Sequence, residues 1–186
     1  MIPLRRRRDD PYLLVVGMTG VRMGDRVAQV GCAHGGRLAA IAAKVGLSGR
    51  AVVVVADEAS AARARKAVEN AGVLVDIETS PPAILPLESD AFNLVVVDDT
   101  GGLLASMPAA DRVASFREAL RVLRPGGRIV VIGAAARGGL GALFSRGSGA
   151  PPFDPSPSLE ADGFKQVRTL AEKEGLVFVE GVKPKA

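Results

Sequence analysis

The feature that most constrains this chain is a run of small apolar residues, Ala-Val-Val-Val-Val-Ala, at positions 51–56. A strand that is apolar along its whole length must be buried on both faces, which is typical of the centre of a parallel sheet. Helical patterns stand on both sides of this run. Leu38, Ile41 and Val45 recur at helical spacing before it, and an alanine-rich segment at 59–70 follows it. This alternation predicts βαβ units and a doubly wound α/β fold of the Rossmann-like kind.

The same alternation continues along most of the 186 residues. The last two apolar runs are joined by a tight connection, Glu-Lys-Glu-Gly at 172–175, which favours an antiparallel hairpin. The strands predicted from apolar, β-branched runs cover 26–31, 51–56, 73–78, 92–97, 128–132, 164–170 and 176–182. The main predicted helices cover 38–45, 59–70 and 109–123.

Length and charge favour a single domain over 1–186, with residues 1–10 as a flexible tail. The net charge is +4, but only Arg5 to Arg8 forms a basic run, and Asp9 and Asp10 follow it at once. Such a run is more often a solvated terminus than a phosphate-binding arm. With one tyrosine and no tryptophan, the chain also lacks a stacking platform for single-stranded nucleic acid. We therefore expect no nucleic-acid partner.

Two further observations concern the cellular setting. The apolar stretch at 12–18 is interrupted by glycine and is much shorter than the ~20 residues of a membrane span, so no membrane partner is expected. The single cysteine, Cys32, cannot form an internal disulfide and has no second thiol with which to begin a zinc site. These features fit a cytoplasmic protein without a metal centre.

A glycine-rich turn, Gly-Cys-Ala-His-Gly-Gly at 31–36, joins the first predicted strand to the first helix. Glycines let the backbone approach a ligand closely, and a helix N-terminus favours electronegative groups. Asp57 stands at the carboxyl end of the next strand, where a carboxylate can accept both hydroxyls of a ribose. The combination predicts an adenosine-containing cofactor. Its spacing also fits a loose dinucleotide fingerprint, so a nicotinamide-dependent oxidoreductase stays open.

Three longer segments carry a family resemblance. They are Gly-Asp-Arg-Val-Ala-Gln-Val-Gly-Cys at 24–32, Leu-Pro-Leu-Glu-Ser-Asp-Ala-Phe-Asn-Leu-Val-Val-Val at 85–97, and Leu-Arg-Val-Leu-Arg-Pro-Gly-Gly-Arg-Ile-Val-Val at 120–131. Together they resemble the class I S-adenosylmethionine-dependent methyltransferases, most closely the branch with quinone-biosynthesis and small-molecule enzymes. The resemblance covers most of the chain, and its third segment is the most specific.

The resemblance implies a mostly parallel seven-stranded sheet in the order 3-2-1-4-5-7-6 with a C-terminal antiparallel hairpin. It implies S-adenosylmethionine as cofactor, bound at the carboxyl ends of strands one, two and four, and methyl transfer to a small-molecule acceptor. Carried over residue by residue, it places Gly31 and Gly35 against the methionine part of the cofactor and Asp57 against the ribose. The remaining residues assigned to cofactor contact are Gln29, Cys32, Ala33, Glu58 and Asp98.

Three positions depart from the family pattern. Gln29 stands where the family has an acidic residue, Ala33 where it has a glycine, and Pro81 near an acidic residue that holds the adenine amino group. Gln29 can still accept a hydrogen bond, but it brings no negative charge to the site. These departures leave open a non-catalytic methyltransferase-like domain that binds cofactor or a partner protein.

Candidate catalytic residues are few. Asp98 and Asp99 end the fourth predicted strand, where the resemblance places the acceptor, so either could accept a substrate proton. Adjacent side chains leave a strand on opposite faces, which disfavours a shared metal ion, and an N-cap role for Asp99 or Thr100 is the simpler alternative. His34, the only histidine, is either a cofactor contact or base, or a solvent-facing loop residue. For Cys32 a small buried filler is favoured over a reactive thiolate.

The sequence says less about which residues bind the substrate, because substrate pockets in such folds are formed by variable loops. The candidate segments are the N-terminal stretch with Tyr12 and Met18, the loop at 99–107, and the loop at 133–158. The last is rich in Gly, Ala, Ser and Pro and is predicted to be mobile, with one short helical piece at 140–144. With little inserted lid, we expect a small pocket or one completed by the second subunit of a homodimer.

Overall fold

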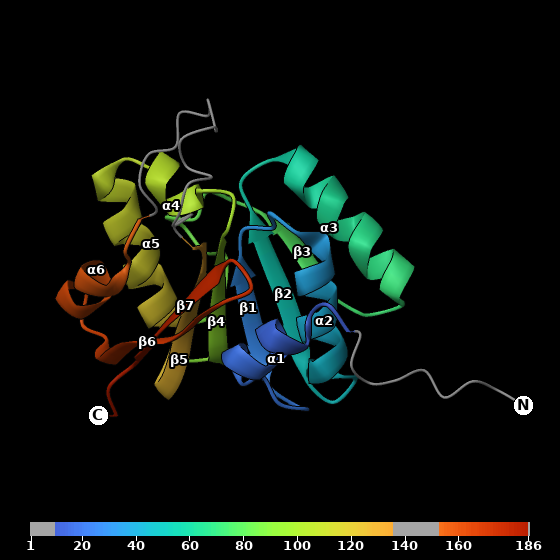
Figure 1. The fold of residues 1–186 in the computed structure, drawn as a ribbon, viewed down its shortest axis with the longest axis horizontal. Coiled ribbons are helices and arrows are strands. Elements are labelled where there is room, and N and C mark those ends of the chain that lie inside the picture. Colours follow the sequence, from blue (N-terminus) through green and yellow to red (C-terminus); the bar gives the residue numbers. More distant parts are fainter. Residues whose placement is uncertain (1–9, 136–152, 186) are drawn as a thin grey trace, which may run out of the picture.

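The computed structural model describes residues 10–135 and 153–185. They build a seven-stranded sheet in the order β3-β2-β1-β4-β5-β7-β6 (Figure 1). Strands β1 to β5 run parallel, whereas β7 is antiparallel to both β5 and β6. The predicted fold class, strand order and C-terminal hairpin are confirmed.

The described elements have the following bounds. The strands are β1 (Arg26–Val30), β2 (Arg50–Val55), β3 (Asp76–Thr79), β4 (Phe92–Asp99), β5 (Leu123–Ala134), β6 (Lys165–Lys173) and β7 (Leu176–Val182). The helices are α1 (Leu13–Thr19), α2 (Gly35–Val45), α3 (Glu58–Ala71), α4 (Leu103–Ser106), α5 (Ala109–Val122) and α6 (Ser156–Ala161).

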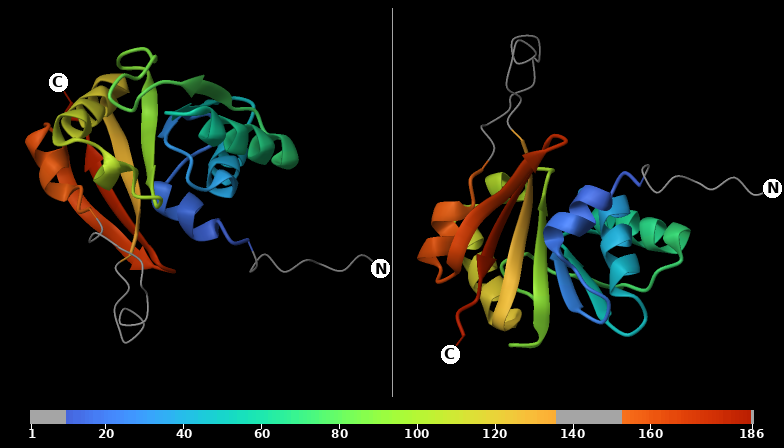
Figure 2. Two further views of the ribbon diagram at one scale, coloured as in Figure 1. Left: turned by 90° about the horizontal axis from the view of Figure 1, so that it is seen from above. Right: turned by 60° about the horizontal axis from the view of Figure 1, so that its bottom comes forward.

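Helices cover both faces of the sheet, which explains why the central strands are apolar on both sides (Figures 1 and 2). Alternate residues of β4 divide between the two layers. Val95 and Val97 pack in one core cluster with Leu104 of α4 and Phe116 of α5. Leu94 and Val96 face the opposite layer, where α1 and α2 pack. Position along a strand therefore decides which helical layer a side chain meets.

Helix α1, in the apolar stretch at 12–18, was not predicted. The chain is helical from Leu13 to Thr19 and ends at Gly20, which adopts the left-handed conformation at φ +61°. Val15 is buried against the core cluster under α2. The helix is short and contains Gly17, so its pattern is weak in sequence, and tertiary packing supplies most of its stability.

Two strand boundaries also differ from prediction. Strand β3 begins at Asp76 rather than at residue 73, because Val73 and Val75 pack beneath α3 before the chain pairs with β2. Strand β5 begins at Leu123, which pairs with Phe92 ahead of an irregularity in the register. The Pro-Gly-Gly segment at 125–127 is therefore enclosed within β5 rather than preceding it.

The predicted loop at 133–158 is structured at both ends. Gly133 pairs with Val177 and extends β5, and Ser156 begins α6. The short helical piece expected at 140–144 lies outside the described residues.

Candidate cofactor site

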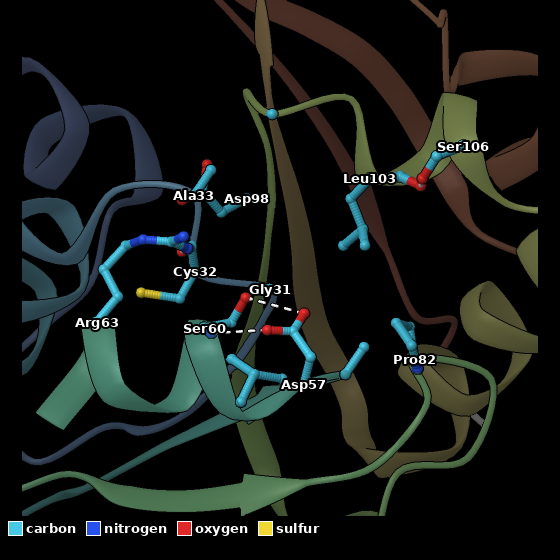
Figure 3. A pocket seen from close by; sticks show the side chains of 13 residues that line it. Gly31, Cys32, Ala33, Asp57, Ser60, Arg63, Pro82, Asp98, Leu103 and Ser106 are labelled. Atoms are coloured by element: carbon cyan, nitrogen blue, oxygen red, sulfur yellow. Dashed lines mark hydrogen bonds between the residues drawn. The ribbon is translucent and has the colours of Figure 1, made fainter.

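A cavity of about 380 Å³ opens at the carboxyl ends of β1, β2 and β4 (Figure 3). This volume falls in the range of roughly 300–1,000 Å³ that small-molecule sites occupy. One wall comes from the start of α3 and the other from α4 and the turn after β3. The lining residues are Gly31, Cys32, Ala33, Val55, Ala56, Asp57, Ser60, Arg63, Pro82, Asp98, Gly101, Leu103 and Ser106.

Gly31 ends β1 in a conformation that suits glycine, with φ +80°. A Cβ at this position would lie 2.9 Å from Cδ2 of Leu103 and 3.3 Å from the carbonyl oxygen of Asp98. Both the backbone conformation and the lack of space therefore require glycine here. Gly31, Cys32 and Ala33 of the turn line the cavity.

Asp57 stands at the end of β2 and lines the same cavity, as the sequence predicts. Its Oδ1 accepts a hydrogen bond from the backbone N–H of Ser60 at 2.8 Å, and its Oδ2 accepts one from the Ser60 hydroxyl at 3.2 Å (Figure 3). These bonds hold the pKa of the carboxyl below its usual value. Because a carboxylate offers about four acceptor positions, the group retains capacity for ligand hydroxyls while it caps α3.

Arg63 also contributes to the wall, on the side of α3 that faces the glycine turn. Its Nη1 donates to the carbonyl oxygen of Cys32 at 2.6 Å, so the helix is tied directly to the turn. Sequence reasoning missed Arg63 and Ser60 as cavity residues, and it placed Leu103 only within the candidate substrate loop at 99–107. Only Ser60 had a usable signal, because it stands three residues after the capping residue Asp57.

The side chain of Cys32 is buried among apolar residues of α2, α3 and β2. Burial, with a further contribution from the nearby charge of Asp98, raises the pKa of its thiol to about 11. A thiol with so high a pKa is a weak nucleophile at neutral pH. The structure thus favours the interpretation of Cys32 as a small filler.

Asp98 is buried, lines the cavity, and holds the glycine turn in place. Its Oδ2 accepts from the backbone N–H of His34 at 3.1 Å, and its Oδ1 accepts from Nη2 of Arg37 at 3.3 Å. Its Oδ1 also accepts from the Thr100 hydroxyl at 2.7 Å, and Arg37 donates to that hydroxyl in turn. Both carboxylate oxygens are therefore engaged with protein groups, and a catalytic role for Asp98 stays a prediction.

Asp99 faces the opposite layer of helices. Its Oδ1 accepts from the backbone N–H of Leu104 at 2.6 Å, so it binds the first turn of α4. The N-cap residue of α4 is Gly102, so Asp99 is not the N-cap weighed for it from sequence, although its carboxylate does bind an N–H of the first turn. Burial is the main cause that raises the pKa of this carboxyl to about 6. Because Asp98 and Asp99 diverge, they do not face a common ion.

His34 and Gly35, which were predicted to face the cofactor, do not line the cavity. The ring of His34 is exposed and lies 5.7 Å from the ring of Tyr12, between centroids. A Cβ on Gly35 would meet Cβ of Ala67 at 2.5 Å, so this glycine permits the close packing of α2 on α3. Glu58, outside the cavity as well, is exposed and pairs with Arg65 at 2.6 Å. Their assigned roles stay predictions.

The positions that depart from the family pattern differ in their surroundings. Gln29 is buried, and its side-chain N–H donates to the carbonyl oxygen of Gly31 at 2.9 Å. Its Oε1 has no hydrogen-bond partner among the described residues. Ala33 lines the cavity, whereas Pro81 does not and its neighbour Pro82 takes that place.

Within residues 10–135 and 153–185, no helix is long and apolar enough to cross a membrane. The same residues contain no group of three or more histidine, cysteine or acidic side chains placed to hold a metal ion.

Comparison with known proteins decides the family. The family described as "Methyltransferase domain" matches residues 27–127, which is more than half of the chain. The chain belongs to the class I S-adenosylmethionine-dependent methyltransferases. The match spans β1 to the beginning of β5 and includes the glycine turn and Asp57. The match also argues against a nicotinamide-dependent oxidoreductase, because that alternative rested only on the loose dinucleotide fingerprint.

Among curated relatives of this methyltransferase domain is the methyltransferase GfsG of Streptomyces halstedii. It is 32% identical over 120 residues, which are 64% of this chain and 41% of GfsG. The ubiquinone/menaquinone biosynthesis C-methyltransferase UbiE of Cronobacter sakazakii is 24% identical over 119 residues, 63% of this chain and 45% of that protein. The chain thus spans less than half the length of these relatives.

Solved structures show the same fold at low sequence identity. A methyltransferase from Aquifex aeolicus, described as S-adenosylmethionine-dependent, aligns with a TM-score of 0.71 and 21% identity over 94% of both chains. The apo form of the S-adenosylmethionine-dependent methyltransferase SibL aligns with a TM-score of 0.70 and 22% identity, over 94% of this chain and 54% of SibL. At such identities the likeness concerns the fold.

Proposed function

We propose that this methyltransferase domain binds S-adenosylmethionine in the cavity at the ends of β1, β2 and β4 and transfers its methyl group to a small-molecule acceptor. The observation that carries the proposal is the position of Asp57, which lines the cavity together with Gly31. The names of GfsG and UbiE, both methyltransferases and the second one of quinone biosynthesis, support the same class of reaction.

The residues present fit this cofactor. Asp57 would accept the ribose hydroxyls with the acceptor positions that Ser60 leaves free. Gly31 and Ala33, which line the cavity, would leave room for the methionine part because neither carries a large side chain. Val55 and Pro82 provide apolar wall for the adenine ring.

When bound, the cofactor supplies a methyl group on a positively charged sulfur. The protein's own task is to position two reactants and to keep water out. Asp98 serves positioning, because it fixes the turn through the N–H of His34 and the guanidinium of Arg37. Asp99 is the candidate to take a proton from the acceptor, since its second oxygen has no hydrogen-bond partner among the described residues.

One observation favours the alternative of a domain that binds without catalysis. Gln29 replaces an acidic residue, and its buried Oε1 has no partner among the described residues. A buried oxygen without a hydrogen bond costs free energy. It also leaves this part of the site uncharged, so cofactor binding is expected to be weaker than in relatives with an acid there.

Ligand-dependent thermal stability tests the proposal. S-adenosylhomocysteine at a hundredfold excess over its dissociation constant should stabilise the chain by about 2.7 kcal/mol. Asp57→Asn should remove most of the shift, because it keeps an oxygen for the α3 cap but loses the charge. Asp76→Asn is the matched control, since Asp76 is exposed and lies outside the cavity. Equal shifts for both variants would contradict the assignment of Asp57.

A further inference from the structure

A cavity of about 420 Å³ opens at the amino ends of β1, β4 and β5, on the edge of the sheet opposite the cofactor cavity. Strand β4 spans both edges, because Asn93 near its start lines this amino-edge cavity and Asp98 near its end lines the cofactor cavity. A ligand here would therefore lie away from the cofactor. The lining residues are Gly20, Arg22, Asp25, Asn93, Leu94, Arg124, Gly126 and Arg128.

Two arginines of the amino-edge cavity carry charge that no neighbour balances. Arg22 and Arg124 are exposed, and their side chains make no hydrogen bond or ion pair with any residue of 10–135 or 153–185. Other arginines at this edge are paired. Arg26, which begins β1, and Arg50, which begins β2, each lie about 3 Å from a carboxylate oxygen. The donors of Arg22 and Arg124 are thus left for a ligand.

A third arginine, Arg128, is fixed in the wall. Its Nη1 donates to Oε2 of Glu180 at 3.1 Å, and its Nη2 donates to the carbonyl oxygen of Thr19 at 2.9 Å. A Cβ on Gly20 would lie 2.6 Å from this Nη2, so glycine makes room for the guanidinium. Because Glu180 also pairs with Arg168, at 2.6 Å, one carboxylate serves two arginines. The wall therefore stays positively charged.

Asn93 and Asp25 add a donor group and an acceptor. Oδ1 of Asn93 accepts a hydrogen bond from the backbone N–H of Arg26 at 2.9 Å, which leaves the amide N–H groups of Asn93 available. Oδ2 of Asp25 accepts one from the backbone N–H of Arg22 at 2.8 Å. Oδ1 of Asp25 has no partner in the described part of the chain. A ligand can thus receive hydrogen bonds from Asn93 and donate one to Asp25.

The charges of the amino-edge cavity select an anion rich in acceptor oxygens. Its three arginines outnumber its one carboxylate, that of Asp25. Lys185 lies beside the cavity, since a Cβ on Gly126 would meet its Cε at 3.2 Å. Each guanidinium presents several donors in a fixed plane, more in total than the two oxygens of a carboxylate can accept. A phosphate monoester has three terminal oxygens and about two negative charges at neutral pH, and so fits better.

The remaining wall favours a polar ligand body. Leu94 is the only large apolar residue among the described lining residues, and it is buried. An apolar body would therefore gain little free energy by entering this cavity. A hydroxyl group, in contrast, can donate to the open oxygen of Asp25.

We propose that the amino-edge cavity binds a phosphate monoester of a polyhydroxy compound, the chemistry of a sugar phosphate. The phosphate accepts hydrogen bonds from Arg22, Arg124 and the amide of Asn93, and a hydroxyl group donates to Asp25. This site is independent of methyl transfer. Because the two cavities lie at opposite edges of the sheet, the phosphate monoester and S-adenosylhomocysteine should not compete.

Titration calorimetry with glucose 6-phosphate, at constant ionic strength in a buffer free of phosphate, tests the proposal. We expect glucose 6-phosphate to bind. Glucose lacks the charge, gluconate carries a carboxylate instead, and inorganic phosphate lacks the hydroxyl groups. Each of the three should bind more weakly by about tenfold or more.

Paired substitutions locate the site. Arg22→Gln combined with Arg124→Gln should weaken glucose 6-phosphate binding by about tenfold or more. Lys66→Gln combined with Lys173→Gln is the matched control, because it changes the net charge equally at two exposed residues outside the cavity. Arg63→Gln removes the arginine of the cofactor cavity and should leave the binding unchanged. Thermal unfolding of each variant checks that it folds, and the single arginine variants replace the pair if it does not.

Four results would overturn the proposal. They are no binding at millimolar glucose 6-phosphate, equal binding of glucose, gluconate or inorganic phosphate, the same affinity in the arginine variants as in the natural chain, and an equal loss in the lysine control or in Arg63→Gln. The last result would mean that general charge or the cofactor cavity holds the anion. Loss of binding in the arginine variants alone supports the amino-edge cavity as a phosphate site.

Discussion

The carboxylate of Asp57 receives two hydrogen bonds from one residue, Ser60, through its backbone N–H at 2.8 Å and its hydroxyl at 3.2 Å. The candidate ribose ligand is therefore also the N-cap of α3. Removing the side chain would disturb the helix and the cavity together. The two functions can be separated by choosing what replaces the aspartate.

Asp57→Ala should lower the melting temperature of the ligand-free chain, whereas Asp57→Ser should leave it nearly unchanged. Serine retains an oxygen that can cap the N–H of Ser60, and alanine does not. Differential scanning calorimetry without ligand measures both. Equal melting temperatures for Asp57→Ala and the natural chain would show that the cap contributes nothing to stability.

Asp98→Ala should destabilise the fold strongly. The substitution leaves the largely buried guanidinium of Arg37 without its carboxylate and removes the acceptor for the N–H of His34. Breaking a buried ion pair from one side typically costs about 3–5 kcal/mol. Urea unfolding checks this value, with Asp76→Ala as control because the pair of Asp76 with Arg50 is exposed. A decrease of less than about 1 kcal/mol in the free energy of unfolding would contradict the role of Asp98 in holding the glycine turn.

The raised pKa of Asp99, about 6, predicts a stability that depends on pH. Because the folded state binds this proton more tightly than the unfolded state, stability falls as pH rises from about 4 to 6. Asp99→Asn keeps an acceptor for the N–H of Leu104 but cannot ionise. It should therefore be more stable than the natural chain at pH 7.5, by up to about 3 kcal/mol. Urea unfolding should show this difference shrinking toward zero near pH 4; a constant difference would argue against ionisation of Asp99.

Methyl transfer should depend on Asp98 or Asp99 and not on His34. The ring of His34 is exposed outside the cavity, whereas Asp98 lines the cavity and Asp99 follows it at the end of β4. With a neutral aromatic alcohol such as 2-naphthol offered as test acceptor, His34→Ala should keep turnover within about twofold, and Asp99→Asn should lower it by about 10²-fold or more. Loss of turnover in the His34 variant alone would reverse this assignment.

Much of the fold was predictable because the strong signals are periodic. The valine run of β2 and the helical spacing of α2 each indicate one structure, so their order along the chain yields the parallel sheet. Helices α1 and α4 were missed because they are short and depend on contacts distant in sequence. Leu104 of α4, for example, is fixed by Asp99 and by Arg112 rather than by its neighbours.

The site was predictable where a backbone turn or a strand end places the residue. Gly31 and Asp57 belong to this class, and both line the cavity. Gly35 was not predictable in this way, because a glycine in such a turn can serve helix packing instead of ligand approach. Arg63 lies within α3, and no local pattern marks it as a cavity residue, whereas Leu103 was placed only within a candidate loop and its role as cavity wall depends on the fold.

The central claim, that this cavity binds S-adenosylmethionine, is tested most directly by titration calorimetry with S-adenosylhomocysteine and, separately, with NAD. We predict one binding site for S-adenosylhomocysteine, no heat with NAD, and tighter binding in Gln29→Asp, which restores the missing negative charge. Absence of binding at millimolar S-adenosylhomocysteine, in both the natural chain and the Gln29→Asp variant, would contradict the claim and favour a domain without catalytic function.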